Sequence, residues 1–168
     1  MSDDYIVGID NGLKGGIVIL KDGLIAAHHG MPLSPCCKRI DAAGVSWIFK
    51  CCPGTATVAI EAAPDHMSSY KAAKSILINY GIIRAAAEIA KLRVVDIPYG
   101  NRLDSWQRAI LGCVPKGKTK KVAEEKAREI WPGVRWPTLH PNGRKPHDGI
   151  IDAALIAHHA RNLDLNRK

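Results

Sequence analysis

Short apolar runs separated by tight-turn residues open the chain. Three of these runs cover residues 5–10, 16–20 and 24–27. Asp22-Gly23 separates the second run from the third, and Asp-Gly between two apolar runs is a strong signal of a β-hairpin. The pattern therefore predicts three short strands joined by tight turns.

After residue 30, helical and strand-like periodicities alternate. Residues 69–90 carry apolar side chains, among them Ile76, Ile83 and Ala87, at the spacing that forms one face of a helix. Further helices are predicted over 40–50, 105–111, 122–130 and 148–161, and further strands over 55–60 and 92–97. This order predicts an α/β fold in which helices flank a mixed β-sheet. Because no repeat or long linker divides the chain, we expect residues 1–168 to form one domain.

Three carboxylates occupy positions where folding alone would favour an apolar residue. Asp10 and Glu61 each close an apolar strand, and Asp152 is the only polar residue between Gly149 and Ala157. A helix that apolar is packed against other elements, so an ionised carboxylate within it needs a partner or a metal ion. Salt bridges to Lys or Arg are the competing explanation for each acid taken singly.

Asp148 is the fourth candidate acid, because it lies one helical turn before Asp152. Its position also suits an N-cap, and we keep that alternative open. Converging buried acids repel one another unless a cation offsets their charge. Oxygen donors suit Mg²⁺, with Mn²⁺ as a substitute, and such ions can activate water for phosphodiester hydrolysis.

Positive charge is concentrated in the second part of the sequence. The net charge is +8, of which residues 1–100 contribute +1 (10 Lys/Arg against 9 Asp/Glu) and residues 101–168 contribute +7 (14 against 7). This asymmetry favours a polyanionic partner such as nucleic acid, with a solvated basic surface as the alternative. No apolar stretch approaches the roughly 20 residues that cross a bilayer, so we expect a cytoplasmic protein.

Cysteine, tryptophan and histidine residues have structural interpretations first. Cys36-Cys37 and Cys51-Cys52 lack zinc-ribbon spacing, so we interpret them as small buried side chains around a helix, with a metal or redox role as the alternative. We interpret Trp131 and Trp136 as packing residues, and we expect the pairs His28-His29 and His158-His159 to lie on surfaces.

Several motifs taken together resemble the RuvC-type Holliday junction resolvases, above all the compact members from phages and prophages. They are Gly8-Ile9-Asp10-Asn11-Gly12, Ile60-Glu61 and His147-Asp148-Gly149-Ile150-Ile151-Asp152, in the family's order. The resemblance implies an RNase H-like fold, a homodimer, and Mg²⁺-dependent paired nicks in a four-way DNA junction. It also implies that Asp10, Glu61, Asp148 and Asp152 are the metal-binding catalytic acids.

The resemblance extends to a basic region before the last helix. Lys118, Lys120 and Lys121 match the family's phosphate-contacting lysines, and we expect a wider DNA-binding set of Lys14, Arg108, Lys116, Lys118, Lys120 and Lys121. The family commonly has Pro where Asn11 stands, and its bacterial members carry an aromatic wedge shortly after the glutamate. Here residues 62–67 contain no aromatic residue, so His66 and Met67 are the candidates for that role, and His147 is a candidate auxiliary group.

The sequence thus predicts a metal-dependent, structure-selective DNA endonuclease that resolves four-way junctions as a homodimer. The apolar face of residues 69–90 is the candidate dimer interface, although the internal core could use it instead. Two alternatives stay open: a related RNase H-like nuclease that acts on RNA or on other branched DNA, and a catalytically silent DNA-binding dimer.

Overall fold

A computed structural model describes residues 4–63, 70–99, 105–140 and 143–165. Its elements, in chain order, are β1 (Tyr5–Asp10), β2 (Gly16–Lys21), β3 (Leu24–Gly30), α1 (Ala42–Lys50), β4 (Thr57–Glu61), α2 (Tyr70–Ile89), β5 (Arg93–Ile97), the short π-helix η1 (Gln107–Leu111), α3 (Thr119–Ile130) and α4 (Asp148–Leu165). The strands form one sheet in the order β3-β2-β1-β4-β5. The hairpin pairs β1–β2 and β2–β3 are antiparallel, whereas β1–β4 and β4–β5 are parallel. The predicted α/β fold with a mixed sheet is confirmed.

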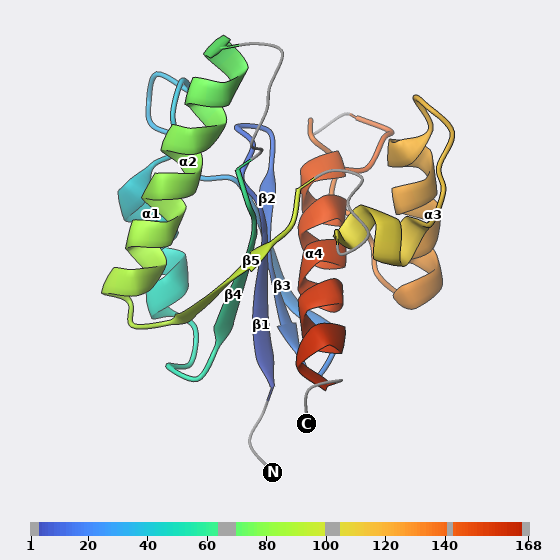
Figure 1. Ribbon diagram of the computed structural model, residues 1–168, viewed down its shortest axis with the longest axis horizontal. Coiled ribbons are helices and arrows are strands. Elements are labelled where there is room, and N and C mark those ends of the chain that lie inside the picture. The colour runs from blue at the N-terminus through green and yellow to red at the C-terminus, as the bar shows by residue number, and fades with distance from the viewer. Residues whose placement is uncertain (1–3, 64–69, 100–104, 141–142, 166–168) are drawn as a thin grey trace.

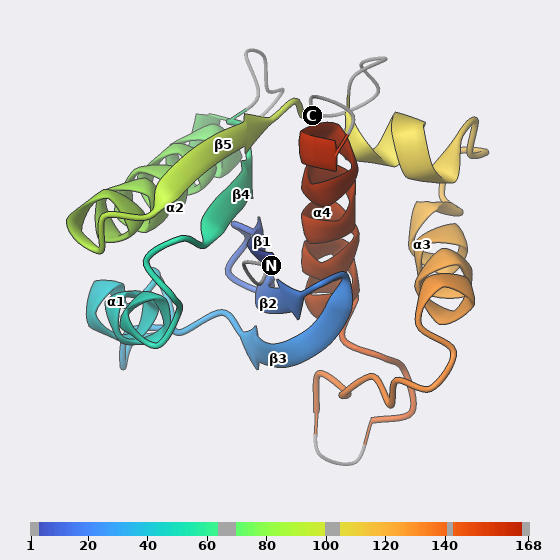
Figure 2. The same ribbon diagram turned by 90° about the horizontal axis from the view of Figure 1, so that it is seen from below.

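Helices cover both faces of the sheet (Figures 1 and 2). The alternation of side chains along β1 sends Val7 and Ile9 into a core shared with α1 and α2. Ile6 points the other way, into a core shared with α3 and α4. Asp10 follows the alternation of Ile6, so β1 directs it toward the α4 side of the sheet.

Glycine allows α4 to lie directly on β1 and on the turn after it. A Cβ atom at Gly8 would overlap the Ala153 carbonyl and come within 2.6 Å of the Ala157 Cβ. A Cβ at Gly149 would lie 2.5 Å from the Gly15 Cα, and these two glycines form an isolated parallel bridge. Because a side chain at either position would push the two segments apart, glycine fixes the height of α4 above β1.

Several local predictions are corrected. Cys36, Cys37 and Cys51 are exposed rather than buried, because the first pair lies in the loop before α1 and Cys51 caps the end of that helix. His159 is buried rather than exposed, because it lies one helical turn after the buried Leu155 on the same side of α4. The neighbouring His158 ring packs edge-on against Trp131 at 5.6 Å.

Trp131 and Trp136 are both buried and contact each other edge-to-face, with ring centroids 6.0 Å apart. Their interpretation as packing residues is confirmed. Among the described residues, no helix combines the length and the apolar character that a membrane span needs.

Candidate active site

Two of the four predicted acids meet at one edge of the sheet. Asp10 ends β1 and Glu61 ends β4, and the parallel register pairs Ile9 with Ile60, one residue before each acid. Both acids therefore leave the same edge of adjacent strands. The alternation of Ala59 and Glu61 along β4 sends Glu61 to the α4 side as well, because Ala59 lies in the core beneath α4.

Asp152 approaches this edge from α4, and the acids perturb one another. Burial raises the pKa of Asp152 to about 8, and the charges of Asp10, Glu61 and Asp148 add to the increase. Burial also raises the pKa of Glu61 to about 7, and that of Asp10 above its usual range. Burial, with added repulsion between neighbouring carboxylates, thus favours retention of protons over full ionisation.

The chemistry of these donors fits a divalent cation of the Mg²⁺ class. A cation would supply the positive charge that buried, mutually repelling carboxylates lack, and it would replace their protons. Within the described residues, however, no three acidic, histidine or cysteine side chains already stand in a geometry that would hold a metal. Metal binding would therefore have to draw the acids closer together.

One oxygen of each strand-end acid already has a protein donor. Asp10 Oδ1 accepts a hydrogen bond from the Gly12 N–H at 3.0 Å. Glu61 Oε1 accepts one from the Trp106 indole N–H at 2.9 Å, and Trp106 is itself buried. These contacts fix the orientation of both carboxylates before any ligand arrives.

His147, rather than Asp148, caps α4. Its Nδ1 accepts the Ile150 N–H at 3.3 Å, and its carbonyl oxygen accepts from Ile150 and Ile151 at 3.0 and 3.2 Å. The N-cap interpretation of Asp148 is therefore wrong. The Asp148 side chain instead forms an ion pair with Lys120 and stays partly exposed. Burial lowers the pKa of His147, which keeps its imidazole neutral and able to accept the capping hydrogen bond.

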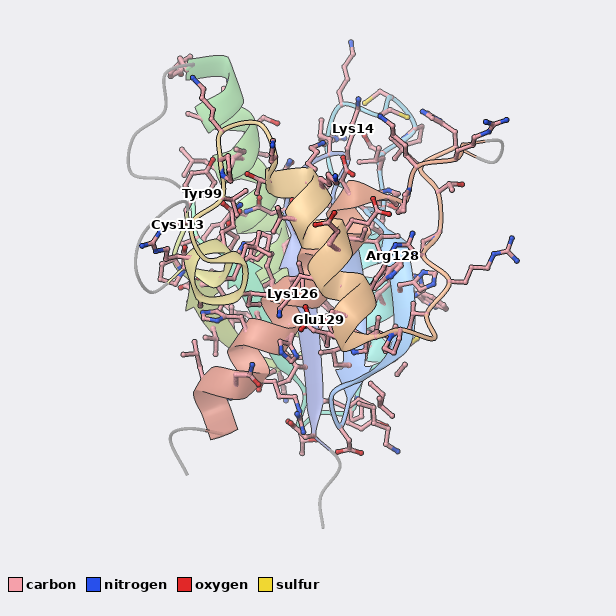
Figure 3. The ribbon with its side chains drawn as sticks, turned by 90° about the vertical axis from the view of Figure 1, so that its right-hand side faces the viewer. Lys14, Tyr99, Cys113, Lys126, Arg128 and Glu129 are labelled. Atoms are coloured by element: carbon pink, nitrogen blue, oxygen red, sulfur yellow. The ribbon has the colours of Figure 1, made fainter. Side chains whose placement is uncertain are left out.

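A cavity of about 630 Å³ opens beside the acids, and its walls carry both signs of charge. Asp10, Asp148 and Asp152 contribute the acids, and the cations are Lys14, Lys120, Arg144 and Lys145. Lys14 is labelled near the top of Figure 3, at the end of the molecule where α4 begins. A phosphate group in this cavity would therefore meet both the cations and the carboxylates.

Sequence reasoning missed part of this cavity. Arg144, Lys145 and His140 line it, and all three belong to the proline-containing loop that precedes α4. Two adjacent basic residues immediately before the His147-Asp148 motif were the available signal. Of the predicted DNA-binding residues, only Lys14 and Lys120 line the cavity.

The other predicted DNA-binding residues lie on the surface and do not line the cavity. Lys116, Lys118 and Arg108 are exposed, and the Arg108 guanidinium contacts the Cys113 sulfur. Lys121 is exposed and pairs with Glu125 at 3.7 Å. His66 and Met67, the candidates for the wedge, lie outside the described residues.

A buried chain of amides, also missed from the sequence, connects α2 to the site. The Asn79 side chain donates to the Asn11 carbonyl at 3.2 Å, and the Asn11 side chain donates to the Glu61 carbonyl at 3.1 Å. Both asparagines are buried. Asn11 thus ties the β1–β2 turn to the end of β4.

We expect Trp106→Phe to weaken the binding of Mn²⁺ or Mg²⁺ by roughly 10- to 100-fold, the usual effect of losing a group that orients a ligand. The reason is that Glu61 would lose its indole donor and with it a fixed orientation. Trp136→Phe is the matched control, because Trp136 is also buried but its indole nitrogen has no partner in the described structure. Metal titration by calorimetry would compare them, and equal affinities would remove Trp106 from this role.

Comparison with known proteins identifies the fold. The chain is similar to the solved structure "T. thermophilus RuvC in complex with Holliday junction substrate", with a TM-score of 0.60 and 14% identity over 97% of this chain and 96% of that one. It is also similar to "Thermus thermophilus RuvC structure", with a TM-score of 0.58 and 16% identity over 95% and 96% of the two chains. Neither a family model nor a curated protein matches the sequence. The RNase H-like fold of the RuvC type is thereby confirmed.

Proposed function

We propose that this protein is a metal-dependent, structure-selective DNA endonuclease that resolves four-way junctions. The observation that carries the proposal is the convergence of Asp10, Glu61 and Asp152, from two strand ends and one helix, beside a cavity that four cations also line. The likeness to a RuvC structure bound to a Holliday junction supports the choice of substrate. A cytoplasmic location suits an enzyme that acts on DNA.

Each part of the site has a separate task in this proposal. Asp10, Glu61, Asp148 and Asp152 would hold Mg²⁺ or Mn²⁺, which when bound supplies an activated water and stabilises the leaving oxygen. Lys14, Lys120, Arg144 and Lys145 would bind phosphates and orient the strand over the acids. For Asp148 to bind the metal ion, Lys120 would have to release the Asp148 carboxylate and pair with a DNA phosphate instead. The Trp106 and Gly12 donors keep the carboxylates oriented.

The deciding experiment is a cleavage assay with four-way junctions, flaps, replication forks, linear duplexes and RNA in parallel, in Mg²⁺ and in Mn²⁺. Paired symmetric nicks in the junction are the expected result. Preferential cleavage of RNA would favour the related RNA nuclease. Tight junction binding with no cleavage in either metal would favour a silent DNA-binding protein.

The lysines before and at the start of α3 should bind phosphates of the DNA. We expect Lys118→Ala/Lys120→Ala/Lys121→Ala to weaken DNA binding and to reduce the slope of log affinity against log salt by roughly 0.9 for each duplex phosphate that the variant no longer neutralises. The control is Lys126→Ala/Arg128→Ala, farther along α3 (Figure 3), where these cations pair with Glu129 and Glu124. An unchanged slope in the triple variant would mean that the cluster is only solvated surface.

A four-way junction has two-fold symmetry, so two matched nicks call for two active sites related by a two-fold axis. We propose a homodimer that uses α2. One side of this helix buries Ile83, Ala86 and Ala87 in the core, while Tyr70 and Leu77, two turns apart, are exposed. The helix thus serves the internal core and still presents apolar surface. Light scattering at micromolar concentration should give twice the mass of 18.2 kDa, and a monomer both free and junction-bound would contradict the dimer.

A further inference from the structure

A second hollow lies across the β1–β2 turn from the cavity beside the acids. Its volume is about 680 Å³, close to that of the first, and its walls come from the loop between β3 and α1, from α2 and from Leu13. The neighbouring residue, Lys14, lines the cavity beside the acids. Only a few ångströms of backbone therefore separate the two hollows along the turn. We call the second hollow the α2 groove.

The α2 groove is basic. Lys38, Arg39 and Lys74 line it, and no acidic residue does. All three cations are exposed, and none forms an ion pair with an acidic side chain that the structure describes. Most other basic side chains on α2 and α3 behave differently, as Arg84, Lys126 and Arg128 show by pairing with nearby acids. Three unpaired cations around one hollow create a positive potential that an anion would neutralise.

The floor of the groove is joined rigidly to the acids. Asn79 lies in the groove lining and starts the buried amide chain that runs through Asn11 to the Glu61 carbonyl. Leu13 and Ile78 add apolar surface to the same hollow. A strand held here would thus have a fixed position relative to the carboxylates, with cations for its phosphates and apolar contact for its sugars.

We propose that the α2 groove binds the sugar-phosphate backbone of the DNA substrate at a second point, across the turn from the scissile phosphate. The inference rests on the proposed function and adds to it a contact that sequence reasoning assigned to none of these residues. Binding on both sides of the β1–β2 turn would hold the DNA strand across the acids. It would also favour branched substrates, whose strands diverge at the turn, over a straight duplex.

The test compares two variants of equal charge in the full chain. Lys38→Ala/Lys74→Ala removes two cations from the groove. The control, Lys50→Ala/Lys91→Ala, removes two exposed lysines near the ends of α1 and α2. These helix ends precede the amino ends of β4 and β5, so both lysines lie at the sheet edge opposite the acids. Affinity for a four-way junction, a linear duplex and a single strand of RNA is measured in EDTA, so that cleavage does not interfere.

We expect the groove variant to lose about 1.8 from the slope of log affinity against log salt on the junction, for two phosphate contacts. The ratio of wild-type affinity to variant affinity should then be about 12-fold smaller at 200 mM salt than at 50 mM salt. The control should keep the wild-type slope, and Lys38→Arg/Lys74→Arg should restore it. The loss of affinity should be largest on the junction, and an equal or larger loss on RNA would overturn the assignment to DNA.

Other outcomes separate the groove from the function. If wild-type protein binds and cuts junctions while the groove variant matches the control, the groove assignment is wrong and the proposed function stands. If wild-type protein binds no nucleic acid, both fail. A changed oligomeric state of the groove variant in light scattering, with unchanged DNA affinity per dimer, would show that the groove is an interface between two copies and would overturn DNA binding there.

Discussion

Asp10→Asn, Glu61→Gln and Asp152→Asn should each abolish cleavage, with a loss on the order of 10³-fold or more, while junction affinity in EDTA stays at the wild-type level or rises. Each amide keeps the shape of the side chain but removes the charge that would hold a cation. Binding depends on the basic side chains instead, and removing a carboxylate near bound phosphates lessens repulsion. Single-turnover cleavage and equilibrium binding on the same junction measure the two effects separately.

Asp96→Asn is the matched control, because Asp96 is a partly exposed acid that pairs with Arg84 of α2, on the face of the sheet opposite the α4 side. Cleavage near the wild-type rate in any of the three variants would remove that residue from the catalytic set.

Asp148→Asn tests whether Asp148 is a metal ligand. Since His147 supplies the helix cap, loss of cleavage in this variant with an unchanged melting temperature would identify a ligand role for Asp148.

The second large effect concerns the metal-free protein, which should become less stable as the pH rises from about 6.5 to about 9. Folding raises the pKa of Asp152 from 3.8 to about 8 and that of Glu61 from 4.5 to about 7. The folded state therefore binds more protons than the unfolded state up to about pH 8, and that stabilisation is lost as the pH passes the folded pKa values. The combined loss is about 3 kcal/mol, of which Asp152 contributes about 2 kcal/mol.

Denaturant titrations in EDTA at several pH values would measure this loss. Asp152→Asn isolates the contribution of one carboxyl. Across the same pH interval, the free energy of unfolding of wild type should fall by about 2 kcal/mol more than that of the variant. Mg²⁺ should have its largest stabilising effect on wild type at the alkaline end, where the acids are ionised and able to bind it. Parallel pH profiles for wild type and Asp152→Asn would contradict the burial of an ionisable group at this position.

The acids were predictable because each one violates the local pattern of its own element. Asp10 and Glu61 end apolar strands, and Asp152 interrupts an apolar helix, so each is visible within a few residues of sequence. The convergence of Asp10 and Glu61 follows from the parallel pairing of β1 and β4, which brings the carboxyl ends of the two strands to one edge. Asp152 joins them because α4 packs directly on β1. Periodicity alone was therefore sufficient for the fold class and for the acidic part of the site.

Contacts between distant segments were not predictable in the same way. Trp106 lies 45 residues from the Glu61 carboxylate that it contacts. Asn79 lies 68 residues from its acceptor on Asn11. Arg144 and Lys145 reach the cavity because of the path of an irregular loop. Residue type was misleading at the start of α4, because aspartate is a preferred N-cap residue and Asp148 was therefore an open candidate, whereas the structure uses His147.

The packing of α4 on β1 also has a consequence for the order of folding. The site needs Asp10 from the first strand and Asp152 from the last helix, and these segments meet only after nearly the whole chain has been synthesised. Contacts of such long sequence separation form late and slowly, because loop closure must precede them. A nascent chain that has exposed β1 and β4 but not yet α4 would carry Asp10 and Glu61 without Asp148 and Asp152, so we expect it to lack the proposed nuclease activity.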